Sequence, residues 1–208
     1  MALTNDDLHA WIHRYTERVN EQREHLTKLD SAIGDGDHGQ NLARGLQAAA
    51  ERIDGAEDVA STMRAVAMAL ISKTGGASGP LYGTFFMDAG KATPDAPLTL
   101  DGWAHMMRAG LEGVQRRGKA EPGDKTMVDA LLPAVEALET AAANGQDLKV
   151  ALKEAAAQAK KGMEATTPMV AKKGRASYLG ERSAGHQDPG ATSSFYLFET
   201  AADALSSA

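Results

Sequence analysis

Cysteine is absent from this 208-residue chain, so disulfides, thiolate metal sites and cysteine nucleophiles are excluded. An excess of positive charge is also lacking. The chain has 22 basic and 28 acidic residues, and its net charge of −6 argues against nonspecific binding to nucleic acid or anionic membranes. No apolar run is long enough to span a membrane, and the first residues lack the basic and apolar regions of a signal peptide. We therefore expect a cytoplasmic protein with no nucleic-acid or membrane partner.

Helical periodicity dominates what is present. Apolar residues recur three and four positions apart along most of the chain, without a convincing strand or a sequence repeat. The length supports one domain covering residues 1–208. Thr4 is expected to cap the first helix, Asp124 to cap the sixth, and Pro133 to kink the sixth without breaking it. We predict eight helices, at about 4–29, 38–54, 58–72, 78 onward, 99–118, 124 onward, 148–165 and 190–205.

Short connections between most of these helices predict an all-α, antiparallel up-and-down barrel, because a short loop makes consecutive helices neighbours. The loops near residues 30–37, 74–80, 118–126 and 166–189 must then lie together at one end. The loops of the other end are ordinary polar turns. All of the unusual chemistry is therefore expected at a single end.

The most specific stretch of the sequence is residues 29–41, where Asp30, Asp35 and Asp37 lie among three glycines before a helix start. Clustered carboxylates repel one another unless solvent or a cation compensates them, and hard oxygen ligands favour Mg²⁺. The structural alternative is that Asp30 ends a helix, Asp35 makes a turn and Asp37 caps the next helix. Three acids with His38 and Asn41 in one loop favour the metal interpretation.

Helix N-termini at the same end favour phosphate. Four predicted helices begin there, so their unpaired N–H groups and positive dipole ends point into the site. Lys172, Lys173, Arg175 and Arg182 add positive charge, although such loop cations are usually solvated. The residues alone thus predict a Mg²⁺-nucleotide site, with Met127 either in the core or against the base.

Other patterns are weaker. Residues 34–39 fit the dinucleotide pattern G-x-G-x-x-G, but no strand precedes them, and residues 113–120 end in alanine where a P-loop requires serine or threonine. A hydrolase triad of Ser78, His38 and Asp35 lacks a nucleophile elbow. The histidines of the predicted helices are expected on the surface or in packing, and His186 is open to either a turn or a functional role.

Four blocks, at residues 33–39, 75–84, 118–127 and 174–192, together resemble the nucleotide-binding subunits of bacterial dihydroxyacetone kinases. The resemblance covers nearly the whole chain and implies an eight-helix barrel that holds nucleotide phosphates through two Mg²⁺ ions. By position, it makes Asp30, Asp35 and Asp37 the metal ligands. The residues that it implies for ADP or ATP are His38, Gly39, Gln40, Asn41, Ala77, Ser78, Gly118, Met127, Arg175, Asp188, Pro189 and Gly190.

The family resemblance also implies partners. In the phosphotransferase-coupled form, bound ADP accepts a phosphoryl group from a phosphohistidine carrier protein and passes it to dihydroxyacetone on a separate substrate-binding subunit. The alternatives are a subunit that exchanges ATP, acting on dihydroxyacetone or another small ketose, and a nucleotide-sensing regulatory module without turnover. A homodimer is left open.

Overall fold

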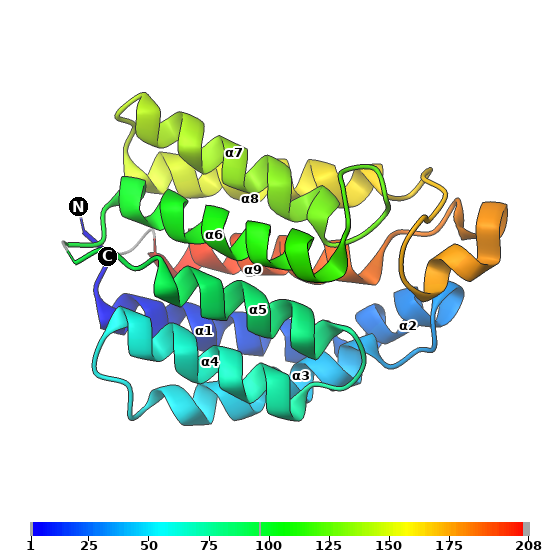
Figure 1. Cartoon of the computed structure of the whole chain (residues 1–208), viewed down its shortest axis with the longest axis horizontal. Helices are drawn as coiled ribbons and strands as arrows, with labels where there is room; N and C mark the ends of the chain where they lie inside the picture. Colours follow the sequence, from blue (N-terminus) through cyan, green and yellow to red (C-terminus); the bar gives the residue numbers. More distant parts are fainter. Residues whose placement is uncertain (1, 96, 206–208) are drawn as a thin grey trace.

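This computed structural model describes residues 2–95 and 97–205, and the regular elements within them are helices joined by loops (Figure 1). The all-α prediction is confirmed. Within those residues only an isolated antiparallel bridge, between Leu3 and Leu98, resembles strand pairing. No described helix is both long enough and apolar enough to cross a membrane. The elements are α1 (Asn5–Glu21), α2 (Arg23–Ile33), α3 (His38–Ile53), α4 (Val59–Lys73), α5 (Ser78–Lys91), α6 (Leu100–Gly118), α7 (Val128–Ala143), α8 (Leu148–Ala165), the 3₁₀ helix η1 (Arg175–Ser183) and α9 (Pro189–Leu205).

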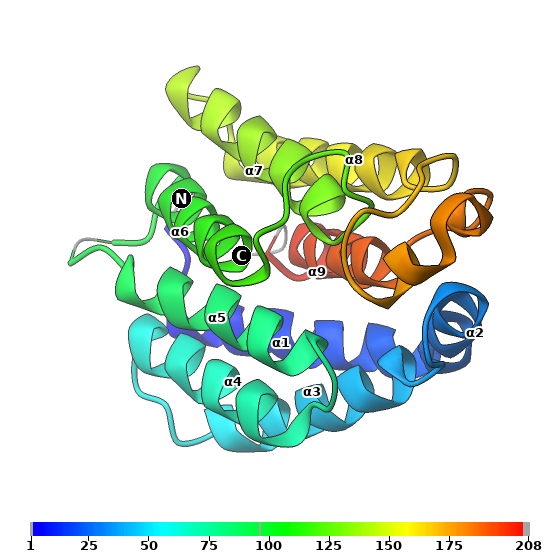
Figure 2. The same ribbon diagram turned by 45° about the vertical axis from the view of Figure 1, so that its right-hand side comes forward.

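The helices pack in chain order. From α3 to α8 each α-helix contacts the next, α8 contacts α9, and α9 returns to α1, which packs against α3. Eight helices therefore form a closed ring, and α2 and η1 lie outside it at one end (Figures 1 and 2). Large side chains fill the middle of the ring, since Trp11, Trp103, Phe85 and Phe86 are fully buried.

Local sequence explains several helix ends. Thr4 and Asp7 form a reciprocal capping box at the start of α1, so the predicted cap is confirmed. Helix α7 continues through Pro133, as expected. The α8 backbone approaches that point closely, since a Cβ on Gly162 would lie only 2.1 Å from the Asp129 carbonyl oxygen. Glycine at position 162 is thus required for the contact between α7 and α8.

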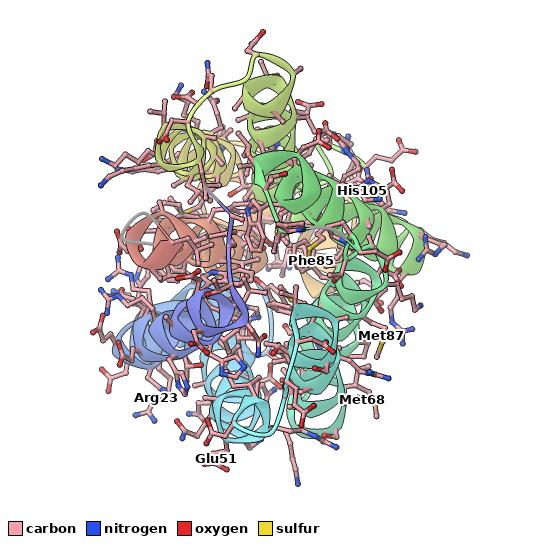
Figure 3. All side chains as sticks on the ribbon, turned by 90° about the vertical axis from the view of Figure 1, so that its left-hand side faces the viewer. Arg23, Glu51, Met68, Phe85, Met87 and His105 are labelled. Carbon is pink, nitrogen blue, oxygen red and sulfur yellow. The ribbon has the colours of Figure 1, made fainter. Side chains whose placement is uncertain are left out.

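The core is built around aromatic side chains in spite of their scarcity. Trp11 packs edge-on against Trp103, with ring centroids 5.0 Å apart, and also contacts Phe86. In a view roughly along the helix axes, Phe85 lies in the interior, whereas Met68, Met87 and Glu51 lie on the outside (Figure 3). Phe85, Phe86, Met106 and Met107 are fully buried in the core, whereas Met87 is half-buried.

Three boundary predictions were wrong. The first predicted helix is two helices that break at Gln22, whose φ of −98° and ψ of 10° leave the helical region, and the second continues to Ile33. Asp124 does not cap a helix: its carboxylate accepts the N–H of Glu121, and α7 begins four residues later. The predicted loop near residues 166–189 is not wholly irregular, because it contains η1, which bends at Gly180 where φ is positive.

Candidate functional site

A cavity of about 650 Å³ opens at the end of the ring where α3, α5, α7 and α9 begin. Its lining comes from four separate segments: residues 30–38, 76–82, 114–128 and 173–190. These are the four loops that helix order placed at one end, so this part of the topology prediction is confirmed. Figure 2 shows the loops and η1 gathered on that side.

The three aspartates converge. Each of Asp30, Asp35 and Asp37 offers one carboxylate oxygen within 4.8 Å of the others, and no other group of three acids or histidines does so among the described residues. Asp30 is buried at the end of α2, and its Oδ2 accepts the N–H groups of Asp37 and His38 at 2.9 and 3.1 Å. Asp37 occupies the N-cap position of α3 but makes no side-chain cap bond. The capping interpretation of Asp37 is therefore wrong: the carboxylate that accepts the first N–H of α3, that of His38, belongs to Asp30.

This donor set fits a divalent cation. Oxygen ligands from three carboxylates are the type that Mg²⁺ takes; Asp35 is exposed and Asp37 is half-buried. Arg175 supplies the compensating charge, with its guanidinium 2.9 Å from the Asp35 carboxylate. The geometry thus gathers ligands for an ion beside the N-terminus of α3.

His38 ties three helices together beneath the acidic cluster. Its Nδ1 lies 2.9 Å from the Ser78 hydroxyl and its Nε2 lies 2.9 Å from the Ser193 hydroxyl, which in turn contacts the Tyr82 hydroxyl at 2.7 Å. Burial lowers the pKa of His38 to about 4, so the ring is neutral at pH 7 and joins the network as one donor and one acceptor. Because Ser193 rather than Asp35 occupies Nε2, the arrangement is not a hydrolase triad.

Asp188 and Lys125 also line the cavity. Asp188 caps α9, where its Oδ2 accepts the Ala191 N–H at 2.7 Å. Burial raises the pKa of Asp188 to about 7, against the opposing effects of that hydrogen bond and of Lys125. The Lys125 side chain is 1% exposed, and its ammonium donates to the carbonyl oxygens of Thr166 and His186. Burial lowers the pKa of Lys125.

The predicted site residues are largely brought together. Twelve of the fifteen line the cavity: Asp30, Asp35, Asp37, His38, Ala77, Ser78, Gly118, Met127, Arg175, Asp188, Pro189 and Gly190. The other three, Gly39, Gln40 and Asn41, do not. Met127 is buried and also lines the cavity, so it serves the core and the site together.

Each of those three residues has another environment. A Cβ on Gly39 would lie 2.1 Å from the Arg23 carbonyl oxygen, so glycine allows α2 and α3 to touch. Gln40 lines a separate groove between α2 and α3. Asn41 is buried and its Oδ1 accepts from Arg44. Any contact of Gly39 or Gln40 with a ligand would use the backbone N–H groups of the first turn.

Sequence reasoning missed Lys125, Tyr82 and Ser193. Tyr82 follows Ser78 by one helical turn, and Ser193 follows Pro189 by one turn, so helical spacing from predicted site residues could have found both. Lys125 offered no periodic signal because it lies in a loop, at a φ of +63°. His186 contributes its carbonyl oxygen to Lys125, which assigns it a structural role in the loop.

Asp188→Asn should change how stability depends on pH in the metal-free protein. A carboxyl with a raised pKa stabilises the fold below its ordinary value of 3.8 and loses that contribution as pH rises through about 7. The difference between the two pKa values sets an upper limit of about 4 kcal/mol on this change in the free energy of unfolding. Because water can enter the cavity and reduce the cost of the charge, we expect wild type to lose about 2 kcal/mol of stability relative to Asp188→Asn between pH 4.5 and 7.5. Urea unfolding in EDTA measures it, with Asp101→Asn as an exposed control. Parallel profiles for wild type and Asp188→Asn would contradict it.

Known proteins resemble this chain over nearly its whole length. Residues 32–203 match the DAK2 domain. The chain is 44% identical over 202 residues to the ADP-binding subunit DhaL of the PEP-dependent dihydroxyacetone kinase of Escherichia coli K12, covering 96% of both chains. It is 43% identical over 200 residues to DhaL of the PTS-dependent kinase of Lactococcus lactis, covering 95% of this chain and 96% of that one.

A solved structure shares the fold as well. The dihydroxyacetone kinase of C. freundii in complex with AMP-PNP and Mg²⁺ superposes with a TM-score of 0.72 and 26% identity, covering 98% of this chain. The match takes in 34% of that longer chain.

Proposed function

Because the chain belongs to the DAK2 domain family, we propose that it is the Mg-ADP-binding subunit of a dihydroxyacetone kinase. ADP, held with two Mg²⁺ ions, would carry a phosphoryl group from a phosphohistidine carrier protein to dihydroxyacetone on a separate substrate-binding subunit, giving dihydroxyacetone phosphate. Alone, the chain is expected to leave free dihydroxyacetone unchanged. We place the reaction in the cytoplasm, since the PEP named for the relatives is an intracellular metabolite.

One observation carries the proposal: three carboxylates and the N-termini of four helices converge on one cavity. Carboxylates bind a cation and helix N-termini bind phosphate. The two features together therefore suit a metal-bound phosphate group better than a free cation or a free phosphate. When bound, Mg²⁺ supplies charge neutralisation of phosphate oxygens.

The chain's own residues hold and orient the phosphates. Asp30 fixes the loop that presents Asp35 and Asp37, through its bonds to the two N–H groups at the start of α3. Arg175, Lys173 and Arg117 line the cavity and add positive charge, which stabilises the charge spread in phosphoryl transfer. No general base from this chain is required, because the partner can supply it.

An apolar wall offers a place for the base. Leu81, Val114, Met127 and Val128 line the cavity together with Gly118, and they come from α5, α6, α7 and the loop between α6 and α7, not from the loop that carries Asp35 and Asp37. Flat apolar contact suits an adenine ring, and the approach of backbone at Gly118 suits the ribose. The nucleotide would thus lie with its base toward α6 and α7 and its phosphates toward α3.

Retention of ADP tests the coenzyme role. Purified protein dialysed for days against Mg²⁺ buffer should release close to one ADP per chain on denaturation, and dialysis against EDTA should remove it. With its partner subunit and a phosphorylated carrier protein, the chain should form dihydroxyacetone phosphate steadily. Quantitative chromatography of the nucleotide and an enzymatic product assay measure both. No product from any donor would refute the kinase function and favour a regulatory module.

A second candidate is an ATP-exchanging subunit. The observation that favours it is the similarity to the C. freundii kinase whose structure contains AMP-PNP and Mg²⁺. In that case the cavity should empty on dialysis in Mg²⁺ buffer, and product should form from free ATP without a carrier protein. The dialysis experiment therefore separates the two routes.

A further inference from the structure

The 3₁₀ helix η1 forms one rim of the cavity and is fixed by its inner side. Ala176 and Leu179 pack with Ile33 and Ala171 in a small apolar cluster, separate from the main core. At the start of η1, Arg175 reaches the Asp35 carboxylate at 2.9 Å. The rim is thus attached to α2 and to the acidic loop, as Figure 2 shows for the position of η1 beside α2.

Tyr178 projects from this rim. Tyr178 is 88% exposed, more than any other large hydrophobic residue in the part of the chain that the structure describes. In a 3₁₀ helix, side chains three positions apart eclipse each other. Ala176 and Leu179 are three positions apart and form the inner row of η1. Arg175 and Tyr178 are also three positions apart, so they form a second row. The tyrosine therefore lies further out along the row that begins with the arginine at the cavity.

The chain segment around Tyr178 is rich in basic residues, of which Arg175 pairs with Asp35. Lys172, Lys173, Arg175 and Arg182 accompany it within eleven residues, against the single acid Glu181, in a chain of net charge −6. The Lys172 ammonium forms a long ion pair with the Asp124 carboxylate, at 3.9 Å, and its side chain stays 64% exposed. Tyr and Arg are enriched at the hot spots of protein–protein interfaces. An exposed aromatic ring among basic residues is therefore typical of a residue that anchors a partner protein.

The occupant follows from the chemistry and rests on the proposed function. A phosphoryl group passes directly between donor and acceptor in line, so a protein that carries the acceptor must cover the cavity mouth. Such a protein is needed whether the phosphoryl group arrives from a carrier protein or from ATP. We propose that Tyr178, with Lys172, Lys173 and Arg182, anchors the acceptor-bearing subunit, whose matching surface has a ring-sized pocket edged by carboxylates.

Tyr178→Ala tests the anchor. With the dihydroxyacetone-binding subunit as titrant, the KM for that subunit should rise about tenfold or more, while kcat at saturation, ADP retention and thermal midpoint stay unchanged. Tyr178→Phe should restore most of the affinity. Val150→Ala, a 55% exposed residue at the start of α8 and at the opposite end of the ring, is the matched control. Higher salt should weaken wild-type binding, because the rim is cationic.

Direct binding separates this inference from the proposed function. Sedimentation of the two subunits measures their affinity without turnover. If wild type makes no product yet binds the subunit, the proposed function fails and Tyr178→Ala is still judged by its Kd. An unchanged Kd and KM in Tyr178→Ala would overturn the anchor alone, as would a loss confined to the phosphorylated carrier protein. Absence of any binding by wild type would overturn both.

Discussion

Asp35→Ala and Asp37→Ala are each expected to weaken Mg²⁺-dependent retention of nucleotide by a factor of about 100 or more. Each removes one of three oxygen ligands that lie within 4.8 Å of one another, and two remaining carboxylates compensate an ion poorly. The far-UV circular dichroism should keep its helical form. Isothermal titration with ADP in the presence of Mg²⁺ measures the loss.

The apo fold should not suffer from these changes. Removing one of three clustered carboxylates relieves their mutual repulsion, so the unfolding midpoint in EDTA should stay level or rise. Asp101→Ala, an exposed acid at the start of α6 and at the other end of the ring, is the matched control and should bind normally. Full nucleotide retention in both Asp35→Ala and Asp37→Ala would refute the metal assignment.

Lys125→Met is expected to cost the fold about 3–5 kcal/mol. The ammonium is the hydrogen-bond donor that joins the loop before α7 to the carbonyl oxygens of Thr166 and His186 on the loop before α9. Methionine has similar length but no donor, so those carbonyls lose a buried partner and Asp188 loses a nearby positive charge. Urea unfolding at pH 7.5 without ligand gives the change.

Two comparisons show whether the loss comes from burial. Lys153→Met, at an exposed position of α8, should change stability by less than about 0.5 kcal/mol. Nucleotide affinity of Lys125→Met, measured at a temperature where it is folded, should also fall because Asp188 and its neighbours line the cavity. A variant as stable as wild type would mean that water replaces the ammonium.

Helical spacing and helix order were enough to predict most of the fold. The apolar pattern located the long helices, and alternation of short loops brought four distant segments to one end before any contact was known. The break at Gln22 could not be predicted, since glutamine forms helices well and the apolar spacing continues across it. The start of α7 was missed because an aspartate in a loop looks the same as a capping aspartate in sequence.

The site residues, too, were predictable from the sequence only in part. The aspartates were found because three acids in one short loop are unusual, and the family resemblance extended the set to the base. Gly39 and Gln40 show the limit of assignment by position: one glycine serves helix packing, and the neighbouring side chain points into another groove. Lys125 was beyond reach, since only tertiary structure shows that this one lysine is buried.

The attachment of α2 has a consequence for local stability. Apart from Leu26, the buried apolar residue that it contributes is Ile33, which belongs to the small cluster with η1 and not to the main core. Segments with few buried contacts open at lower free energy than the rest of a protein. Asp30 and Arg175 therefore sit on a part of the molecule that is expected to open more readily than the main core. A ligand held across α2, η1 and α3 would add its binding free energy there, so that occupancy of the cavity and the folding of its rim become one linked equilibrium.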